Sequence, residues 1–200
     1  KKDTVVVLDI LPANASLDGK HKIISLVRDK INLEEQAVKR SIIEVKKDDV
    51  THKIGVISLP AFYQDFEARS KGDKDFRSAT RDTSHAIESL KNDKVDSILI
   101  DLRNNGGGSL SEAIEMTGLF IDQGPVVQQR NAGGDVSVQR DESEGVIWNG
   151  PLGVLINRGS ASASEIFAAA MQDYGRAVII GEPSFGKGTV QTVVNLDEMS

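Results

Sequence analysis

The stretch VDSILIDLRNNGGGSLSEAIEM, residues 95–116, decides the fold class of this chain. Its first eight residues form a short apolar run that is typical of a buried β-strand. Three consecutive glycines follow at 106–108, and the apolar spacing of 109–121 predicts a helix. A strand that leads through a tight turn into a helix is the repeating unit of an α/β domain. This stretch therefore predicts an α/β fold.

The same alternation of strands and helices continues on both sides of this stretch. The predicted strands of the core are 53–59, 95–102, 125–130, 135–142, 151–157, 176–182 and 189–196. The predicted helices are 77–93, 109–121 and 162–175. Because segments 125–130 and 135–142 follow each other closely, we expect them to form a hairpin. The other strands alternate with helices, which predicts a mainly parallel sheet over 53–200.

The N-terminal part of the chain has a different pattern. Segments 4–11 and 21–33 are rich in Val and Ile and predict a hairpin-type pair of strands. The charged segment 34–49 is expected to form a short helix or a connector, and we place a domain boundary there. The expected division is an N-terminal segment 1–37, a connector 38–52 and a core 53–200.

The composition is that of a globular protein and excludes several kinds of site. Of the 200 residues, 39% are hydrophobic and 27% are charged. A net charge of −6 argues against a nucleic-acid partner, because a nucleic-acid-binding face normally shows a basic excess. The absence of cysteine excludes disulfides, zinc–thiolate sites and thiol catalysis. With three histidines, all before residue 86, we expect no multi-histidine metal site.

The segment GEPSFGKGT, residues 181–189, differs by one residue from the phosphate-binding pattern G-x-x-x-x-G-K-[ST]. That loop needs a helix after it, whose free N–H groups hold the phosphates. Here the alternating segment TVQTVVNL follows and predicts a strand, and Gly188 occupies the place of the magnesium-binding hydroxyl. We therefore expect no nucleotide. On local grounds Lys187 is a solvated lysine in a loop between two strands.

The segment NRGSASASEIFAAAMQDYG, residues 157–175, leads from a strand into a helix. Ser162 and Glu165 match a capping box, with Ser162 as N-cap and Glu165 at the third helical position. The same position would also expose the Ser162 hydroxyl beside helix N–H groups that can stabilise an oxyanion. The sequence leaves the structural and the catalytic interpretation open.

A catalytic Ser162 would need a base. The G-x-S-x-G elbow of α/β-hydrolases is absent, and His21, His52 and His85 do not lie in distinctive loops. A neutral lysine can replace histidine as the base. Phe185 and the glycines around Lys187 predict a dry, close-packed loop, and burial favours the neutral amine.

The glycine run at 106–108 also allows two interpretations. Glycines after a strand adopt unusual backbone angles and leave N–H groups free, which suits an oxyanion or a peptide backbone. A plain strand-to-helix turn explains them equally well.

Taken together, the segments DLRNNGGG, NRGSASASEIFAAAMQDYG and GEPSFGKGTVQ resemble the carboxyl-terminal processing proteases in order and spacing, over residues 53–196. The resemblance implies a serine endopeptidase with a Ser-Lys dyad, a crotonase/ClpP-like α/β core and no cofactor. It also implies that 1–37 is the trailing part of a PDZ domain and that the core over 53–200 is incomplete at its C-terminus. The implied setting is the bacterial periplasm, with polypeptide substrates bearing apolar C-termini and an adaptor lipoprotein as a partner.

The resemblance assigns roles to individual residues. It implies that Ser162 is the nucleophile and that Lys187, 25 residues later, is the general base. Gln191 matches a position that orients the lysine, and an extended KGTVQ segment would place both side chains on one face. The N–H groups of Ala163 and of a glycine, for which we expect Gly107, would form the oxyanion hole.

Asp173 matches an acidic residue that counts as a further catalytic candidate. Eleven residues along a straight helix span about 16 Å, which is too far for direct contact with Ser162. Asp173 is therefore kept as a catalytic candidate with a structural role as the alternative. Exchange of Asp173 for alanine is expected to leave most activity.

Two other functions remain open. One is an inactive peptide-binding fragment or scaffold of such a protease. The other is a crotonase-like enzyme acting on acyl thioesters, since a fold does not determine a function. The serine–lysine pair disfavours the second, because thioester chemistry of that kind relies on oxyanion N–H groups and carboxylates.

Overall fold

The computed structural model describes residues 2–16, 18–29 and 37–191. The chain divides into two compact units, Lys1–Glu35 and Gln36–Ser200, called unit 1 and unit 2 below. Each unit is described by itself. None of the helices in the described residues combines the length and the apolar character that a membrane span requires.

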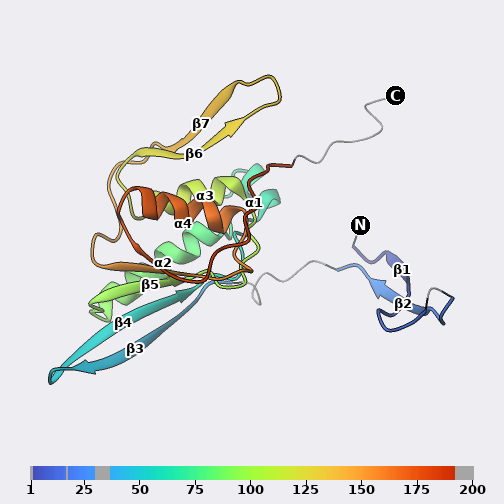
Figure 1. The fold of residues 1–200 in the computed structure, drawn as a ribbon, viewed down its shortest axis with the longest axis horizontal. Helices are drawn as coiled ribbons and strands as arrows, with labels where there is room; N and C mark the ends of the chain where they lie inside the picture. The colour runs from blue at the N-terminus through green and yellow to red at the C-terminus, as the bar shows by residue number, and fades with distance from the viewer. Residues whose placement is uncertain (1, 17, 30–36, 192–200) are drawn as a thin grey trace. The chain divides into compact units, whose positions relative to one another are not determined.

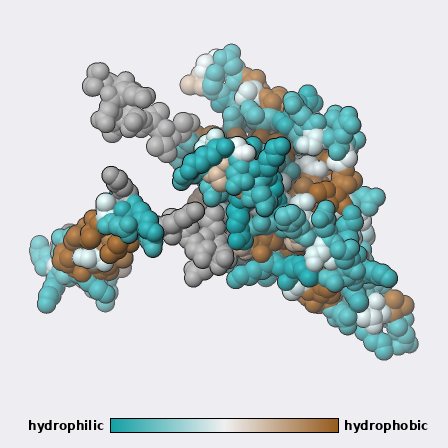
Figure 2. Space-filling view, turned by 180° about the vertical axis from the view of Figure 1, so that it is seen from behind, coloured by the Kyte–Doolittle hydropathy of each residue, from teal (hydrophilic) through white to brown (hydrophobic). Residues whose placement is uncertain are grey.

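Unit 1 contains the predicted pair of strands. Strands β1 (Val5–Ile10) and β2 (Lys22–Val27) pair antiparallel, with Val5 opposite Val27. Two strands cannot bury their own apolar side chains. Most of the large ones are accordingly exposed (Figure 2), and they are Val5, Val7, Leu8, Ile10, Ile23, Leu26 and Val27.

Unit 2 is built on a five-stranded sheet. Its strands are β3 (Lys39–Lys47), β4 (Val50–Ser58), β5 (Ser97–Asp101), β8 (Leu152–Ile156) and β9 (Val178–Gly181). They lie in this order across the sheet. Only β3 runs antiparallel to its neighbour, and β4, β5, β8 and β9 are parallel to one another. The predicted α/β fold with a mainly parallel sheet is confirmed.

The prediction of a helix or connector over 34–49 is wrong for residues 39–47, which form β3. Asp48 and Asp49 connect β3 to β4, and both have positive φ angles, of 49° and 61°. Two-residue hairpin loops of type I′ need positive φ at both positions, and Asp tolerates it. The many charged residues of 34–49 suggested a helix. Residues 39–47 form a strand instead, because the turn at Asp48 and Asp49 lets them pair with β4.

The helices lie on one face of this sheet. They are α1 (Phe66–Ser70), α2 (Ala79–Asn92), α3 (Leu110–Thr117) and α4 (Ala163–Asp173). Figure 1 shows α3 and α4 between the sheet and a separate hairpin made of β6 (Gly124–Arg130) and β7 (Val136–Asp141). The predicted 125–130/135–142 hairpin is therefore confirmed.

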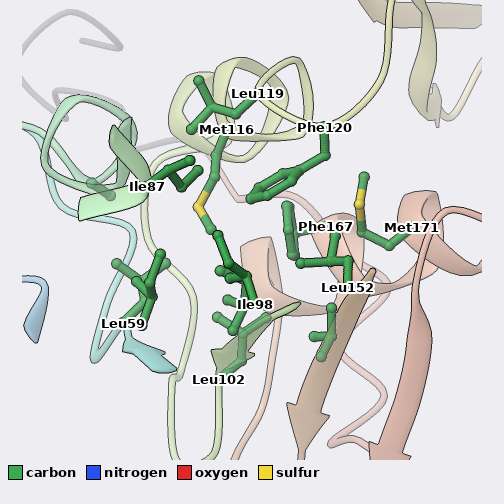
Figure 3. Packing of buried hydrophobic residues seen from close by; sticks show 14 of the residues in the cluster. Leu59, Ile87, Ile98, Leu102, Met116, Leu119, Phe120, Leu152, Phe167 and Met171 are labelled. Atoms are coloured by element: carbon green, nitrogen blue, oxygen red, sulfur yellow. The ribbon is translucent and has the colours of Figure 1, made fainter. Parts of the chain in front are cut away.

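The core fills the space between the sheet and the helices (Figure 3). Because side chains alternate along a strand, Ile98 and Ile100 of β5 point into it and are buried. Phe167 of α4 packs its ring against Phe120, with ring centroids 5.8 Å apart. Gly55 of β4 allows Leu90 to pack closely, because a Cβ at Gly55 would lie only 2.7 Å from a Leu90 methyl carbon. This core holds the beginning of α4 at the edge of the sheet.

Candidate active site

The three motif loops follow neighbouring parallel strands. Residues 102–108 follow β5, residues 157–162 follow β8, and residues 182–188 follow β9. Because parallel strands end at the same edge, the three loops meet there. The carboxyl edge of a parallel sheet is the usual ligand-binding edge of such folds.

Asn105 joins the first two loops. Asn105 is fully buried. Its main-chain carbonyl oxygen accepts hydrogen bonds from the N–H of Ala161 (3.0 Å) and the hydroxyl of Ser164 (2.8 Å). The neighbouring Asn104 donates its N–H to Oδ1 of Asn157 at 2.8 Å. The glycine loop and the serine loop therefore form one connected structure.

Ser162 is the N-cap of α4 and has φ 57° and ψ −115°. A positive φ is unfavourable for a residue with a side chain and is typical of functional sites. The Ser162 N–H donates to Oε2 of Glu165 at 2.8 Å, and Glu165 is the third helical residue. The positions predicted for the capping box are confirmed. Ser162 is half-buried, and it lines two cavities.

The two predicted oxyanion donors differ in their hydrogen bonding. Ala163 is the first residue of α4. Its N–H donates no hydrogen bond to an acceptor within residues 37–191. The N–H of Gly107 donates to Oδ1 of Asn105 at 2.9 Å. Gly107 nevertheless lies directly against the serine, because a Cβ there would be 2.7 Å from Cβ of Ser162. The assignment of Gly107 as a donor stays a prediction.

Lys187 and Ser162 line the same two cavities, of about 690 and 360 Å³. The loop that carries Lys187 is fastened to the serine segment. The N–H of Phe185 donates to the carbonyl of Ser160 at 2.9 Å, and the N–H of Lys187 donates to Glu165 at 2.9 Å. The structure thus brings Ser162 and Lys187 to one site.

The expected dry surroundings of Lys187 are not observed. Lys187 is exposed, and so is Phe185, at 69%. Gly186 has φ +89°, a backbone angle that glycine adopts without steric cost, so it allows the loop to turn. The prediction that Lys187 is buried was wrong. Whether a loop is buried depends on distant parts of the chain packing over it, which local composition does not reveal.

The remaining predicted residues do not join the described site. Asp173 is the last residue of α4 and is exposed, at the opposite end of the helix from Ser162. Gln191 is exposed and lies in no strand. Of the predicted strand 189–196, residues 189–191 are not in a strand, and the rest lies outside the described residues.

Two features of the site have no signal in the sequence: the β6–β7 hairpin as part of it, and the hydrogen bonds between Glu165 and the lysine loop. The hairpin forms one wall of the larger cavity, through Val127, Gln128, Gln129, Arg130, Asn131, Asp135, Val136 and Ser137. No motif marks it, since its role depends on how it lies over α4. Among the described residues, no group of three His, Asp or Glu side chains is placed to hold a metal ion.

Comparison with known proteins finds a matching family model and similar relatives. The model of peptidase family S41 matches residues 53–200. The chain is 46% identical over 191 residues to the tail-specific protease of Haemophilus influenzae, covering 96% of this chain and 25% of the relative. It is 35% identical over 181 residues to the chloroplastic carboxyl-terminal-processing peptidase 2 of Arabidopsis thaliana, covering 90% and 32%.

Solved structures share the fold. The photosystem II D1 C-terminal processing protease superposes with a TM-score of 0.67 at 26% identity, over 99% of this chain and 48% of that protein. Mature CPAF superposes with a TM-score of 0.56 at 14% identity, over 93% and 54%, which shows a likeness of fold alone. The chain therefore spans about a quarter to a third of the curated relatives and about half of these solved chains.

Proposed function

The chain belongs to peptidase family S41, and on that premise we propose that it carries the Ser-Lys active site of a serine endopeptidase. Ser162 is the nucleophile and Lys187 is the general base. The observation that carries the proposal is that both line the same cavities, at the N-terminus of α4.

The reaction is acyl transfer to water. The neutral amine of Lys187 takes the proton of the Ser162 hydroxyl while the serine oxygen attacks the peptide carbonyl. The N–H of Ala163 and that of a glycine, for which we propose Gly107, stabilise the tetrahedral anion, at about 3 kcal/mol each. The lysine then protonates the leaving amine, and water releases the acyl group from Ser162.

The hairpin beside the site suggests how a substrate chain is held. β6 pairs only with β7, so its second edge carries unpaired N–H and C=O groups in the described structure. Val127 of β6 lines both cavities with Ser162. We propose that an extended peptide pairs with this edge, as peptides do with sheet edges elsewhere.

We propose that the protease recognises its substrates by their apolar C-terminal tails and acts in protein processing and quality control. Residues 1–37 would be the trailing part of a PDZ domain that holds such tails. The exposed apolar side chains of β1 and β2 support this, because they suit strands that belong to a larger domain. We propose a periplasmic location, in keeping with the bacterial origin of one relative. We also propose an adaptor lipoprotein as a partner.

The exposure of Lys187 favours the alternative, an inactive peptide-binding fragment or scaffold of such a protease. Burial is what favours the neutral amine of a lysine base, and the described structure does not bury Lys187. The two functions differ in whether peptide bonds are cut.

Cleavage of an unfolded protein with an apolar C-terminus by the full-length protein tests the proposal. We expect Ser162→Ala and Lys187→Ala to lower kcat by about 10⁴-fold or more. Lys187→Arg should be equally inactive, because arginine keeps its proton. The exposed Ser70→Ala and Lys74→Ala are the matched controls. Cleavage at the wild-type rate by both dyad variants would exclude the dyad, and an inactive wild-type protein that still binds the tail would favour the scaffold.

A further inference from the structure

The carboxylate of Glu165 collects hydrogen bonds from two separate segments. Oε2 accepts from the N–H of Ser162 (2.8 Å) and the N–H of Lys187 (2.9 Å). Oε1 accepts from the hydroxyl of Ser184 (2.7 Å) and the N–H of Gly186 (2.6 Å). An ionised carboxylate offers about four acceptor positions, so this one is fully used.

Helix capping alone does not explain this arrangement. In a capping box the Glu165 carboxylate accepts only one hydrogen bond, the one from the N-cap N–H. The other three donors lie 19 to 22 residues further along the chain, in the lysine loop. In the described structure, the N–H groups of Gly186 and Lys187 both donate hydrogen bonds to the Glu165 carboxylate. This part of the loop is held by that carboxylate.

The four donors also keep Glu165 charged. Partial burial by itself would raise the pKa of the Glu165 carboxyl, but the hydrogen bonds from Ser184, Gly186, Ser162 and Lys187 outweigh it, so this pKa lies below its ordinary value. At neutral pH the side chain is therefore an acceptor at both oxygens. A glutamine would present an NH₂ group to two of the donors.

We propose that Glu165 is a positioning residue that sets the separation between the nucleophile Ser162 and the base Lys187. Because the main-chain nitrogens of both residues bond the same oxygen, they are held within two hydrogen-bond lengths of each other. The backbone of the dyad is thereby fixed from one point, and the Lys187 side chain starts from a defined position. This inference rests on the proposed function, since it requires Ser162 and Lys187 to react.

Kinetics of the full-length protein with the same unfolded substrate test this role. A displacement of about 1 Å between reacting groups can lower the rate roughly 100-fold. We therefore expect Glu165→Gln to lower kcat by about 100-fold with little change in KM, at a temperature where circular dichroism shows it folded. Glu165→Asp keeps the charge but is one methylene shorter, and we expect a similar loss. The exposed Glu88→Gln on α2 makes the same chemical change away from the site and should retain wild-type kinetics.

Ser184→Ala covers the case in which the Glu165 variants do not fold. It removes one of the four donors and keeps the carboxylate, so we expect a roughly 10-fold lower kcat from a looser lysine loop. A folded Glu165→Gln with wild-type kcat would overturn the inference, as would Ser184→Ala with wild-type kcat if Glu165→Gln is unfolded. A lower kcat matched by an equal rise in KM would also contradict it.

The same series separates the inference from the proposed function. If Ser162→Ala and Lys187→Ala lose activity while Glu165→Gln keeps it, only the role of Glu165 is wrong. If the two dyad variants remain active, the proposed function itself fails.

Discussion

Ser162 and Gly107 are in contact, and the backbone of each has a positive φ, of 57° and 102°. A side chain at Gly107 would be strained by its φ and would also lie 2.8 Å from the carbonyl oxygen of Ala161. Position 107 thus requires glycine because the serine loop packs directly against it. This requirement is independent of any role of the Gly107 N–H in the reaction.

Gly107→Ala is expected to lower the free energy of unfolding by about 2–3 kcal/mol and to reduce cleavage, because the serine loop must move. Gly145→Ala is the matched control, since Gly145 also has a positive φ (82°) but has open space where a Cβ would lie. Urea unfolding of both variants measures the difference. Equal losses would show that backbone strain, and not contact with Ser162, accounts for the effect.

Glu165 makes stability depend on pH in a defined direction. The folded pKa of Glu165 lies below its ordinary value near 4.5, so its carboxylate stabilises the fold above that pH, and this contribution is lost as the pH falls through the folded pKa. Unfolding free energies of wild type and Glu165→Gln should therefore differ most at neutral pH. We expect the difference to shrink below about pH 4.5. A difference that stays constant from pH 7 to pH 3 would contradict this.

At the scale of the elements, the two loops after β5 and β8 are joined through Asn105. Its side-chain NH₂ donates to the carbonyl of Leu59 at 2.8 Å, and its Oδ1 accepts from Gly107. The side chain thereby ties the glycine loop to the end of β4 while the main chain ties it to α4.

Asn105→Ala should lower the free energy of unfolding by about 2 kcal/mol, because it leaves a buried carbonyl without its donor. Cleavage should fall as well, since the glycine loop loses its support. Asn92→Ala, at an exposed helix end, serves as the control and should change stability little. Thermal unfolding and the cleavage assay together check this, and an unchanged melting temperature for Asn105→Ala would be evidence against it.

At the scale of the whole molecule, the core and the site are connected through α4. Phe167 lies five residues after Ser162, is fully buried, and packs against the rings of Phe62 and Phe120. Figure 3 shows Phe167 in the middle of the apolar cluster. The position of the helix start, and so of the serine, depends on this packing.

Phe167→Ala is expected to lower the free energy of unfolding by about 3–5 kcal/mol, through lost contacts and the cavity left behind. Phe66→Ala is the control, because Phe66 is 66% exposed and its removal should cost little. Denaturant titration measures both. A loss below about 1 kcal/mol for Phe167→Ala would mean that the core closes around the gap.

The sequence by itself determined most of the elements of the core, the confirmed N-cap and third-position residues of α4, and the membership of the family. The elements and the cap follow from patterns within about 20 residues, such as the apolar run 95–102 and the Ser162–Glu165 spacing, whose physical basis is local. The family follows from the order and spacing of three motifs over residues 53–196. Only the tertiary structure decided that 39–47 is a strand, that Lys187 is exposed and that Glu165 holds the lysine loop. Pairing, burial and long-range hydrogen bonds depend on segments far apart in the chain, and a local pattern does not specify them.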